Sequence, residues 1–402
     1  MKILIAHNRY VYAGGEDVVV QAERELLESY GHNVLIWEVN NDSIVGIQGK
    51  VKAALSVVYS STSREQIKEK ISHFRPDIVH VHNFFPLLSP AVYDACRDAN
   101  IPVVQTLHNY RLACPKAMPL RDGKICEDCI GKVVPWSGVV HGCYRGSWVQ
   151  SAGVATMLTF HTLRGTWQNR VDTYIALTNF HKDKMVQAGL PKDKIHVKPN
   201  FVLPPKFQSQ TSKLKNYALF VGRLSEEKGV STLIDAYAQG HLSIPLKIVG
   251  DGPLDEALRQ QVQMRGLGEA IAFLGRQSKA TVLELMYNAK FLIFSSIWYE
   301  GFPLTIAEAF ACGLPVIAPK LGSMGEIVED GVTGLHFQAG NSLDLAAKIN
   351  WAITHPEAID TMAINARCTY EAKYTPEANY KQLMEIYNQV INQAQTKSSN
   401  VL

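Results

Sequence analysis

The sequence lacks any apolar run long enough to cross a membrane, and it lacks a recognisable export signal. The longest apolar stretch, residues 149–163, is interrupted by Gly153 and His161, whereas a membrane-spanning helix needs about 20 consecutive apolar residues. The N-terminus, MKILIAHNRY, enters a strand-like run at once and has no small-residue cleavage site. We therefore expect a cytoplasmic protein, or one bound peripherally to the cytoplasmic face of a membrane.

A strong excess of either charge is also missing. The 402 residues carry 40 Lys and Arg against 37 Asp and Glu, a formal net charge of +3, so bulk charge gives no reason to expect nucleic-acid binding. The first half is mildly basic, which would suit an anionic membrane, although such asymmetry is more often incidental. The chain is longer than a domain with a single hydrophobic core usually is, so it should form two domains.

Short apolar runs rich in β-branched residues alternate with segments of helical period along most of the chain. This alternation predicts α/β architecture with parallel sheets and crossover helices. The strand candidates of the first half are KILIA (2–6), NVLIWEV (33–39), DIVHVH (77–82), VVQTLH (103–108), TYIALT (173–178) and IHVKP (195–199). Those of the second half are YALFVG (217–222), LKIVG (246–250), AIAFLG (270–275), KFLIFSS (290–296), PVIAP (315–319) and GLHF (334–337).

The Pro-rich stretch KPNFVLPPKF (198–207) has neither the helical nor the strand pattern of its neighbours, which predicts a linker between domains. We therefore predict two tandem Rossmann-like, doubly wound domains, residues 1–199 and 200–376, with an interdomain cleft. A helix at about 377–394 is expected to pack back on the first domain. Ligands of such sheets bind at the carboxyl ends of the strands.

Two glutamates, Glu300 and Glu308, are separated by seven residues in YEGFPLTIAEAFACGLPVI. Pro303 suits a first helical position and Gly313 a helix end, which predicts a helix over about 303–312 after the strand KFLIFSS. The free N–H groups at its start would bind an anion such as a diphosphate.

The two carboxylates flank this anion site, and they are suited to accept hydrogen bonds from hydroxyl groups. A nucleotide-sugar would fit, with its sugar at Glu300 and its ribose at Glu308. The alternative from spacing alone is structural: Glu308 pairs with a core arginine, and Glu300 caps the helix.

This stretch resembles the E-x7-E hallmark of the family 4 retaining glycosyltransferases, which have the GT-B fold. The resemblance implies donor contacts from the first helical turn and from both glutamates. By position in the motif, the donor-binding residues are Gly301, Phe302, Pro303, Leu304, Thr305 and Glu308, and Glu300 takes a catalytic role.

Two cations and several glycines resemble further parts of the family pattern. GRLSEEKG (222–229) resembles its diphosphate-binding motif, which makes Arg223 and Lys228 catalytic candidates. Taken without the resemblance, the two cations would be read as solvated ion pairs with neighbouring glutamates. IVGDGP and FLGRQS resemble the nucleotide and base loops, so donor contacts are also expected at Gly250, Gly275 and Arg276.

In the first domain, the resemblance points to the glycine pair and to one histidine. Gly14 and Gly15 follow the first strand and should bring backbone N–H groups close to a ligand. His108 ends the strand VVQTLH and matches the family's active-site histidine, although a lone histidine is more often structural. His80 and His82 share one strand face, but they do not fit a catalytic metal site.

Four cysteines lie in a Pro/Gly-rich insertion at 111–147 that the family does not require. One C-x2-C pair with two outlying cysteines suits a structural zinc site, and buried or redox-active thiols are an equally open interpretation. The four candidate ligands are Cys114, Cys126, Cys129 and Cys143. The insertion should influence acceptor choice.

Together these features predict a retaining hexosyltransferase that needs no metal or other cofactor for catalysis. Its donor would be a UDP-, GDP- or ADP-sugar, and its acceptor a glycan or lipid-linked glycan of polysaccharide biosynthesis. The alternatives are a nucleotide-sugar epimerase of the same fold and a non-catalytic, zinc-organised binding module. An NAD-dependent oxidoreductase is disfavoured, because the G-x-G-x-x-G loop and its acidic partner are missing.

Overall fold

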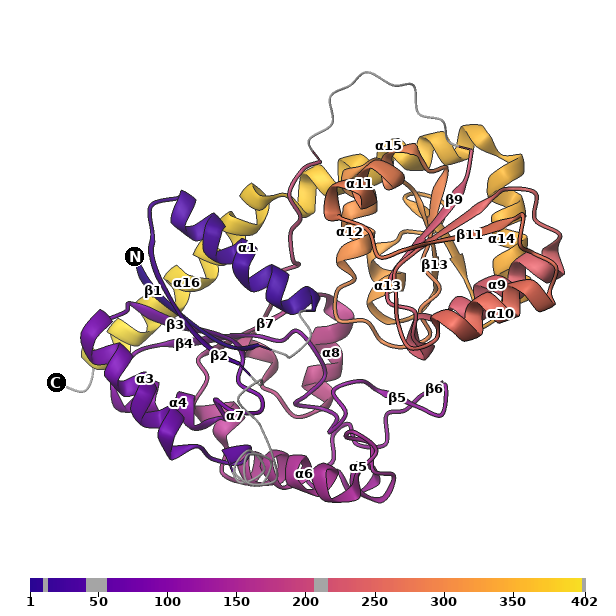
Figure 1. Ribbon diagram of the computed structural model, residues 1–402. Helices are drawn as coiled ribbons and strands as arrows, with labels where there is room; N and C mark the ends of the chain where they lie inside the picture. The colour runs from indigo at the N-terminus through magenta and orange to yellow at the C-terminus, as the bar shows by residue number, and fades with distance from the viewer. Residues whose placement is uncertain (10–13, 41–55, 206–215, 400–402) are drawn as a thin grey trace. The chain divides into compact units, whose positions relative to one another are not determined.

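The computed structural model describes residues 1–9, 14–40, 56–205 and 216–399 (Figure 1). The chain separates into two compact units, each with its own six-stranded parallel sheet. Unit 1 consists of Met1–Pro119, Cys126–Pro199 and Asn379–Leu402, and unit 2 of Leu120–Ile125 and Asn200–Ala378. The two sheets confirm the predicted fold class of tandem Rossmann-like units.

The sheet of unit 1 has the strand order β2-β1-β3-β4-β7-β8. Its strands are β1 (Lys2–Arg9), β2 (Asn33–Asn40), β3 (Ile78–Asn83), β4 (Val103–Thr106), β7 (Thr173–Ala176) and β8 (Ile195–Val197). The helices and helical turns of this unit are α1 (Gly15–Ser29), α3 (Ser61–Phe74), α4 (Ala91–Asp98), α5 (Trp136–Val140), α6 (Trp148–Leu163), α7 (Thr166–Asn169), α8 (Asn179–Gln187) and η2 (Lys192–Lys194). The apolar faces of α1 and α16 (Pro376–Ser399) share one core with β1, β3, β4 and β7.

The sheet of unit 2 has the order β11-β10-β9-β12-β13-β14. Its strands are β9 (Ala218–Val221), β10 (Leu246–Val249), β11 (Ile271–Gly275), β12 (Phe291–Ile293), β13 (Val316–Pro319) and β14 (Gly334–Phe337). Its helices and helical turns are η3 (Glu226–Lys228), α9 (Val230–Gly240), α10 (Asp255–Met264), α11 (Lys279–Asn288), α12 (Leu304–Ala311), α13 (Gly322–Ile327), α14 (Ser342–Thr354) and α15 (Pro356–Lys373). Helices α9, α10, α14 and α15 contribute to one apolar core with the strands.

Each predicted strand segment forms a strand, because buried parallel strands have distinctive apolar sequences. Two details differ from the predictions. Pro303 is the N-cap of α12 with extended backbone (φ −74°, ψ 100°), so the helix begins one residue later, at Leu304. A two-stranded antiparallel hairpin, β5 (Leu120–Arg121) and β6 (Lys124–Ile125), was not predicted, since two-residue strands have no readable period.

A buried ion pair lies inside unit 1, where α1, β3 and the end of β8 meet. Nζ of Lys198 lies 3.2 Å from Oε2 of Glu23, and each side chain is at most 2% exposed. Oε1 of Glu23 lies 3.0 Å from Nδ1 of His80 and 3.1 Å from Nε2 of His82. From α16, the side-chain oxygen of Asn379 accepts a hydrogen bond from Lys198 (3.2 Å).

Neighbouring side chains keep the Glu23 carboxyl ionised although it is buried. Burial alone would raise the pKa of this carboxyl, but Lys198, followed by His80 and His82, lowers it well below its ordinary value. A buried carboxylate with these partners remains ionised at neutral pH. The pair thus ties residues from four distant parts of the sequence into one folded unit.

We predict that Glu23→Leu lowers the free energy of unfolding by about 3–5 kcal/mol, because it leaves the Lys198 ammonium buried without a counter-charge. Urea denaturation measures this, and adding Lys198→Met to the variant should restore part of the loss. Glu28→Gln is the control: it removes the exposed partner of Arg24 and should change stability by less than about 0.5 kcal/mol. A Glu23→Leu protein as stable as the wild type would contradict this account.

Candidate active site

The sheet of unit 2 reverses its direction of growth between β9 and β12. Strands β10 and β11 were added on one side of β9, and β12, β13 and β14 on the other. In open α/β sheets, the loops that leave the two central strands diverge at this switch point and leave room for a ligand at the carboxyl edge. The loop after β9 carries Arg223 and Lys228, and the loop after β12 carries Glu300. The topology therefore brings these predicted residues to one edge.

Lys228 and Glu300 are in direct contact. Nζ of Lys228 lies 2.6 Å from Oε1 of Glu300, and the lysine side chain is 22% exposed against 9% for the glutamate. The same oxygen accepts hydrogen bonds from Oγ of Ser296 (2.8 Å) and Nε1 of Trp298 (3.0 Å). The carboxylate is thus fixed in orientation, while the ammonium keeps donors for a further acceptor.

Backbone contacts hold the two loops together around this pair. Oγ of Ser295 donates to the carbonyl oxygen of Lys228 (2.8 Å). The carbonyl oxygen of Glu227 lies 2.9 Å from Oγ of Ser296 and competes with Glu300 for the single proton of that hydroxyl. Gly229 has a φ of +64°, and a Cβ at this position would lie 2.2 Å from the carbonyl oxygen of Ser295. Only glycine allows the loops to approach this closely.

Gly250, which follows β10 and was predicted to contact the donor, lies where any side chain would collide with the backbone. Gly250 has φ +143°, and a Cβ there would lie 1.8 Å from the carbonyl oxygen of Gly222. Its N–H donates to the carbonyl oxygen of Gly275 (2.9 Å), which itself has φ +67° and open space around its Cβ position. Arg223 and Arg276, which follow β9 and β11, are exposed.

Helix α12 begins directly after Glu300 and the turn Gly301-Phe302-Pro303. Leu304 and Thr305 are half-buried at its first turn, where backbone N–H groups have no partner within a helix. Phe302 anchors the turn, since its ring lies 5.5 Å from that of Tyr374. The helix start is therefore a rigid source of N–H donors beside the Glu300 carboxylate.

Glu308 lies one turn further along α12 and is 12% exposed. Its Oε1 contacts Nζ of Lys279, the first residue of α11, and this lysine is 59% exposed. Glu308 therefore pairs with an exposed lysine rather than with the buried arginine of the structural alternative. An exposed lysine can move away at little cost when a polar ligand takes its place.

In unit 1, His108 lies two residues beyond the end of β4 and is half-buried. Its Nε2 lies 2.9 Å from Nδ1 of His82. Burial, followed by the influence of His80, lowers the pKa of His82 to about 3, and burial also lowers that of His108 well below its ordinary value. Both rings are therefore neutral at physiological pH.

The partners of the two rings favour one arrangement of protons. A carboxylate accepts only, so the nitrogen of His82 that faces Glu23, Nε2, is best protonated. Nδ1 of His82 is then the acceptor for Nε2–H of His108, which leaves Nδ1 of His108 free to accept a hydrogen bond. A cavity of about 20 Å³ lies beside these rings, lined among others by His82, His108, Asn109 and Arg111.

The glycine pair of unit 1 differs from the prediction in one respect. Helix α1 starts at Gly15, with Gly14 as its N-cap, and the N–H of Gly14 donates to Oδ2 of Asp17 (2.8 Å) rather than standing open to a ligand. The other oxygen of Asp17 lies 2.8 Å from Nε2 of His7. Burial, then Asp17, raises the pKa of the adjacent Glu16 to about 8, so this carboxyl can hold a proton at neutral pH.

The four cysteines of the insertion all belong to unit 1 and are free thiols. Burial, followed by the proximity of Cys114, Cys143 and Cys126, raises the pKa of Cys129 to about 11. Among the described residues, the one group of three or more ligand atoms within 4.8 Å of one another is that of Glu23, His80 and His82, so no three of the four sulfur atoms lie that close together. Because Lys198 occupies the carboxylate of that group, it is better explained as the ion-pair network described above.

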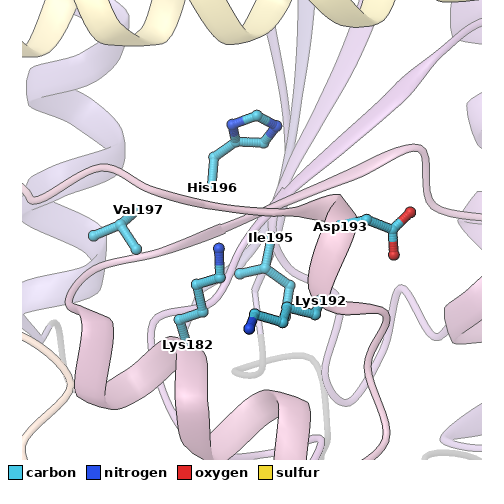
Figure 2. A pocket seen from close by; sticks show the side chains of 6 residues that line it. All are labelled: Lys182, Lys192, Asp193, Ile195, His196 and Val197. Carbon is cyan, nitrogen blue, oxygen red and sulfur yellow. The ribbon is translucent and has the colours of Figure 1, made fainter.

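An open hollow of about 690 Å³ lies beside β8 in unit 1 (Figure 2). Figure 2 shows His196 and Ile195 on opposite sides of the strand, with Lys182 and Lys192 approaching from neighbouring segments. Burial, then the charge of Lys182, lowers the pKa of His196. The sequence-predicted site residues do not line this hollow.

Sequence reasoning missed several side chains that orient the predicted ones. Ser296 and Trp298 sit in the same loop as Glu300, and their polar groups were a readable signal. Lys279 and His82 were not assignable, because their contacts depend on which helix or strand lies next to which. The missed residues are Ser296, Trp298 and Lys279 in unit 2, and Glu16, Asp17, Glu23, His7 and His82 in unit 1.

Comparison with known proteins agrees with this geometry. The family model "Glycosyltransferase Family 4" matches residues 13–204, and "Glycosyl transferases group 1" matches residues 205–369. An uncharacterized glycosyltransferase of Methanocaldococcus jannaschii is 34% identical over 175 residues, 44% of this chain and 48% of that protein. The phosphatidyl-myo-inositol mannosyltransferase of Mycobacterium leprae is 28% identical over 244 residues, 58% and 64% of the two chains. The matches thus span about half to two thirds of these relatives.

Solved structures share the fold at low identity. HepE of Anabaena, in complex with UDP, is 21% identical, with a TM-score of 0.69 over 97% of this chain and 100% of that one. Sucrose-phosphate synthase of Thermosynechococcus elongatus is 19% identical, with a TM-score of 0.72 over 98% and 99%. No helix within the described residues is long and apolar enough to span a bilayer. With both of its halves matched by glycosyltransferase models, the chain belongs to the family 4 glycosyltransferases and has their GT-B fold.

Proposed function

We propose that this glycosyltransferase moves a hexose from a nucleotide-diphosphate sugar to an acceptor hydroxyl, with retention of anomeric configuration and without a catalytic metal ion. The observation that carries the proposal is the Lys228–Glu300 contact at the switch point, next to the first turn of α12. There a cation, a carboxylate and free backbone N–H groups lie at one edge of the sheet. These are the groups that a diphosphate linked to a sugar requires.

The diphosphate is the part of the donor whose charge grows during the reaction. The bond between the anomeric carbon and the diphosphate oxygen breaks, and the oxygen left behind gains negative charge. Lys228, Arg223 and the N–H groups of Leu304 and Thr305 stabilise that charge, which is the role a divalent metal takes elsewhere. Because Lys228 has three donors, it can bind a phosphate oxygen while it still holds Glu300.

The acceptor attacks the anomeric carbon from the face that the diphosphate leaves. The new bond joins this carbon to the acceptor oxygen, and the departing phosphate oxygen takes the acceptor's proton. Glu300 accepts hydrogen bonds from sugar hydroxyls and Glu308 from the ribose, which positions the donor without a covalent intermediate. His108, with Nδ1 as an acceptor, suits a further sugar hydroxyl.

The donor nucleotide best supported is UDP, and the acceptor is a lipid-linked or growing polysaccharide. Solved structures of HepE contain UDP, and one contains UDP-glucose. Among the relatives, the Mycobacterium leprae enzyme is named for a lipid acceptor, phosphatidyl-myo-inositol, and an Erwinia amylovora relative for amylovoran biosynthesis. The alternative of a nucleotide-sugar epimerase, which would convert donor in the absence of any acceptor, gains no support from these relatives.

We predict that Glu300→Gln lowers the transfer rate about 10²–10³-fold, because the neutral amide loses both the Lys228 contact and the strong acceptors for sugar hydroxyls. The readout is release of the nucleoside diphosphate with a glycan acceptor present, using the donor that most raises the melting temperature. Glu371→Gln, which removes an exposed partner of Arg367, is the matched control and should retain wild-type rates. Equal rates for both variants would refute the assignment of Glu300.

We also propose that Cys114, Cys126, Cys129 and Cys143 bind one structural zinc ion. The support is their number and the C-x2-C spacing within one short segment, and a bound ion would hold the four sulfur atoms closer together than they lie in this structure. The segment around them has little secondary structure beyond the hairpin of β5 and β6, whose strands have two residues each, and the five-residue helix α5. Such segments commonly depend on metal for stability.

The expected result is about one zinc per chain in protein purified without added zinc, measured by inductively coupled plasma mass spectrometry. Cys126→Ser combined with Cys129→Ser should remove it, because two of four ligands are lost. Cys368→Ser, in an exposed position on α15, should leave the zinc content unchanged. Much less than one zinc per wild-type chain would exclude the site.

A further inference from the structure

Helix α6 is apolar on the side that it exposes as well as on the side that it buries. Its sequence, WVQSAGVATMLTFHTL, contains no Lys, Arg, Asp or Glu. The buried face consists of Ser151, Val154, Ala155, Met157, Leu158 and His161. On the other face, Trp148 is 69% exposed, Val149 58%, Phe160 44% and Leu163 74%. Surface helices of soluble proteins normally turn charged side chains outward.

The exposed apolar residues of α6 form one stripe. Positions 149, 152, 156, 160 and 163 recur every three to four residues, which places them on one side of a helix with 3.6 residues per turn, and Trp148 lies four residues before Ala152 on the same side. The polar residue within this stripe is Thr156. The stripe is therefore a mainly apolar surface along the helix, interrupted once by the exposed Thr156.

Helix α5 and the loop before it extend this apolar character. Trp136 is 67% exposed and Val140 76%, and the two lie four residues apart on the same side of α5. Val133 and Val134 are 49% and 45% exposed. Helix α5 packs against α6, and Figure 1 shows the two side by side. Half of the large exposed apolar side chains of the described residues lie within residues 133–163.

The charge around this surface is mainly positive, and its exposed acidic neighbour is Asp128, whose Oδ2 accepts a hydrogen bond from Oγ of Ser137 on α5 (3.1 Å). No Asp or Glu occurs from residue 129 to residue 171. Lys132 and Arg145 are exposed next to the apolar side chains, and the guanidinium of Arg145 lies 5.4 Å from the ring centroid of Tyr144. Apolar residues, tryptophans and an excess of cations over acids are the combination that binds anionic lipid surfaces.

We infer that α5 and the exposed stripe of α6 form a docking surface for an anionic lipid bilayer. Tryptophan rings suit the boundary between headgroups and acyl chains, because they are amphipathic. Helix α6 has 16 residues, a length of about 24 Å, whereas the hydrocarbon core is about 30 Å thick. The helix therefore lies in the plane of the interface and does not cross it.

A second copy of the chain fits this surface less well. In a two-fold symmetric dimer the same patch would face itself, which would bring the exposed Lys132 and Arg145 of both copies together, two cations against the one Asp128 of each copy. Anionic headgroups neutralise these charges. The bilayer is therefore the occupant that charge complementarity favours.

The purpose of the surface rests on the proposed function: a bilayer would present a lipid-linked acceptor to the enzyme. The binding itself does not rest on it, because vesicle binding is measured without donor or acceptor. Failure of transfer and failure of docking are therefore separate results.

The test is co-sedimentation of the full chain with vesicles of phosphatidylcholine alone and with 30 mol% phosphatidylglycerol. The wild type should bind the anionic vesicles at least about tenfold more tightly than the neutral ones, and 0.5 M NaCl should reduce this preference. Trp136→Ser combined with Trp148→Ser should weaken binding to anionic vesicles by at least about tenfold. Lys132→Glu combined with Arg145→Glu should remove the preference for phosphatidylglycerol.

The matched control is Leu343→Ser combined with Ile364→Ser, at positions of unit 2 that are 64% and 65% exposed. It should bind anionic vesicles like the wild type, and melting temperatures should show that every variant is folded. Wild-type protein that does not bind, or that binds both vesicle types equally, would overturn the inference. So would a concentration-dependent dimer that the double tryptophan variant abolishes, because the surface would then serve a second copy.

Discussion

The contact between Lys228 and Glu300 is the interaction on which the chemistry proposed for unit 2 depends. Its partners lie 72 residues apart in the chain, and they meet because β9 and β12 are neighbours at the point where the sheet changes direction. The loops can approach only because Gly229 has no side chain to collide with Ser295. A charge pair placed beside the start of a helix is prepared for an anion before the anion arrives, so little reorganisation remains to be done on binding.

Unit 1 uses charge differently. It encloses the Lys198–Glu23 pair in its core and directs histidines from that pair toward the carboxyl end of β4. Burial keeps His82 and His108 neutral, so these rings contribute orientation and hydrogen bonding rather than charge. In the proposed reaction, the positive charge that stabilises the diphosphate comes from Lys228 and Arg223 of unit 2. The outer surface of α5 and α6, where large apolar side chains remain exposed, is the lipid-docking surface that we infer.

Much of this could be predicted from the sequence, for identifiable reasons. Short apolar runs such as KILIA and PVIAP predict buried parallel strands, because few other structures have such sequences. The glycine and proline before the apolar residues of α12 predict a turn followed by a helix. The start of α12 was predicted one residue early, because Pro303 fits both the N-cap and the first helical position. Contacts such as Glu23 with His82, or Lys279 with Glu308, could not be predicted. They depend on strand order and helix placement, and neither leaves a trace in local spacing.

The most direct test of the central claim is a crystal structure of the chain with an intact UDP-sugar. The account predicts that the diphosphate lies against the N–H groups of Leu304 and Thr305 with Lys228 in contact, that Glu300 accepts from sugar hydroxyls, and that Glu308 has left Lys279 for the ribose. A complex in which both carboxylates keep their present partners while the nucleotide lies elsewhere on unit 2 would contradict it.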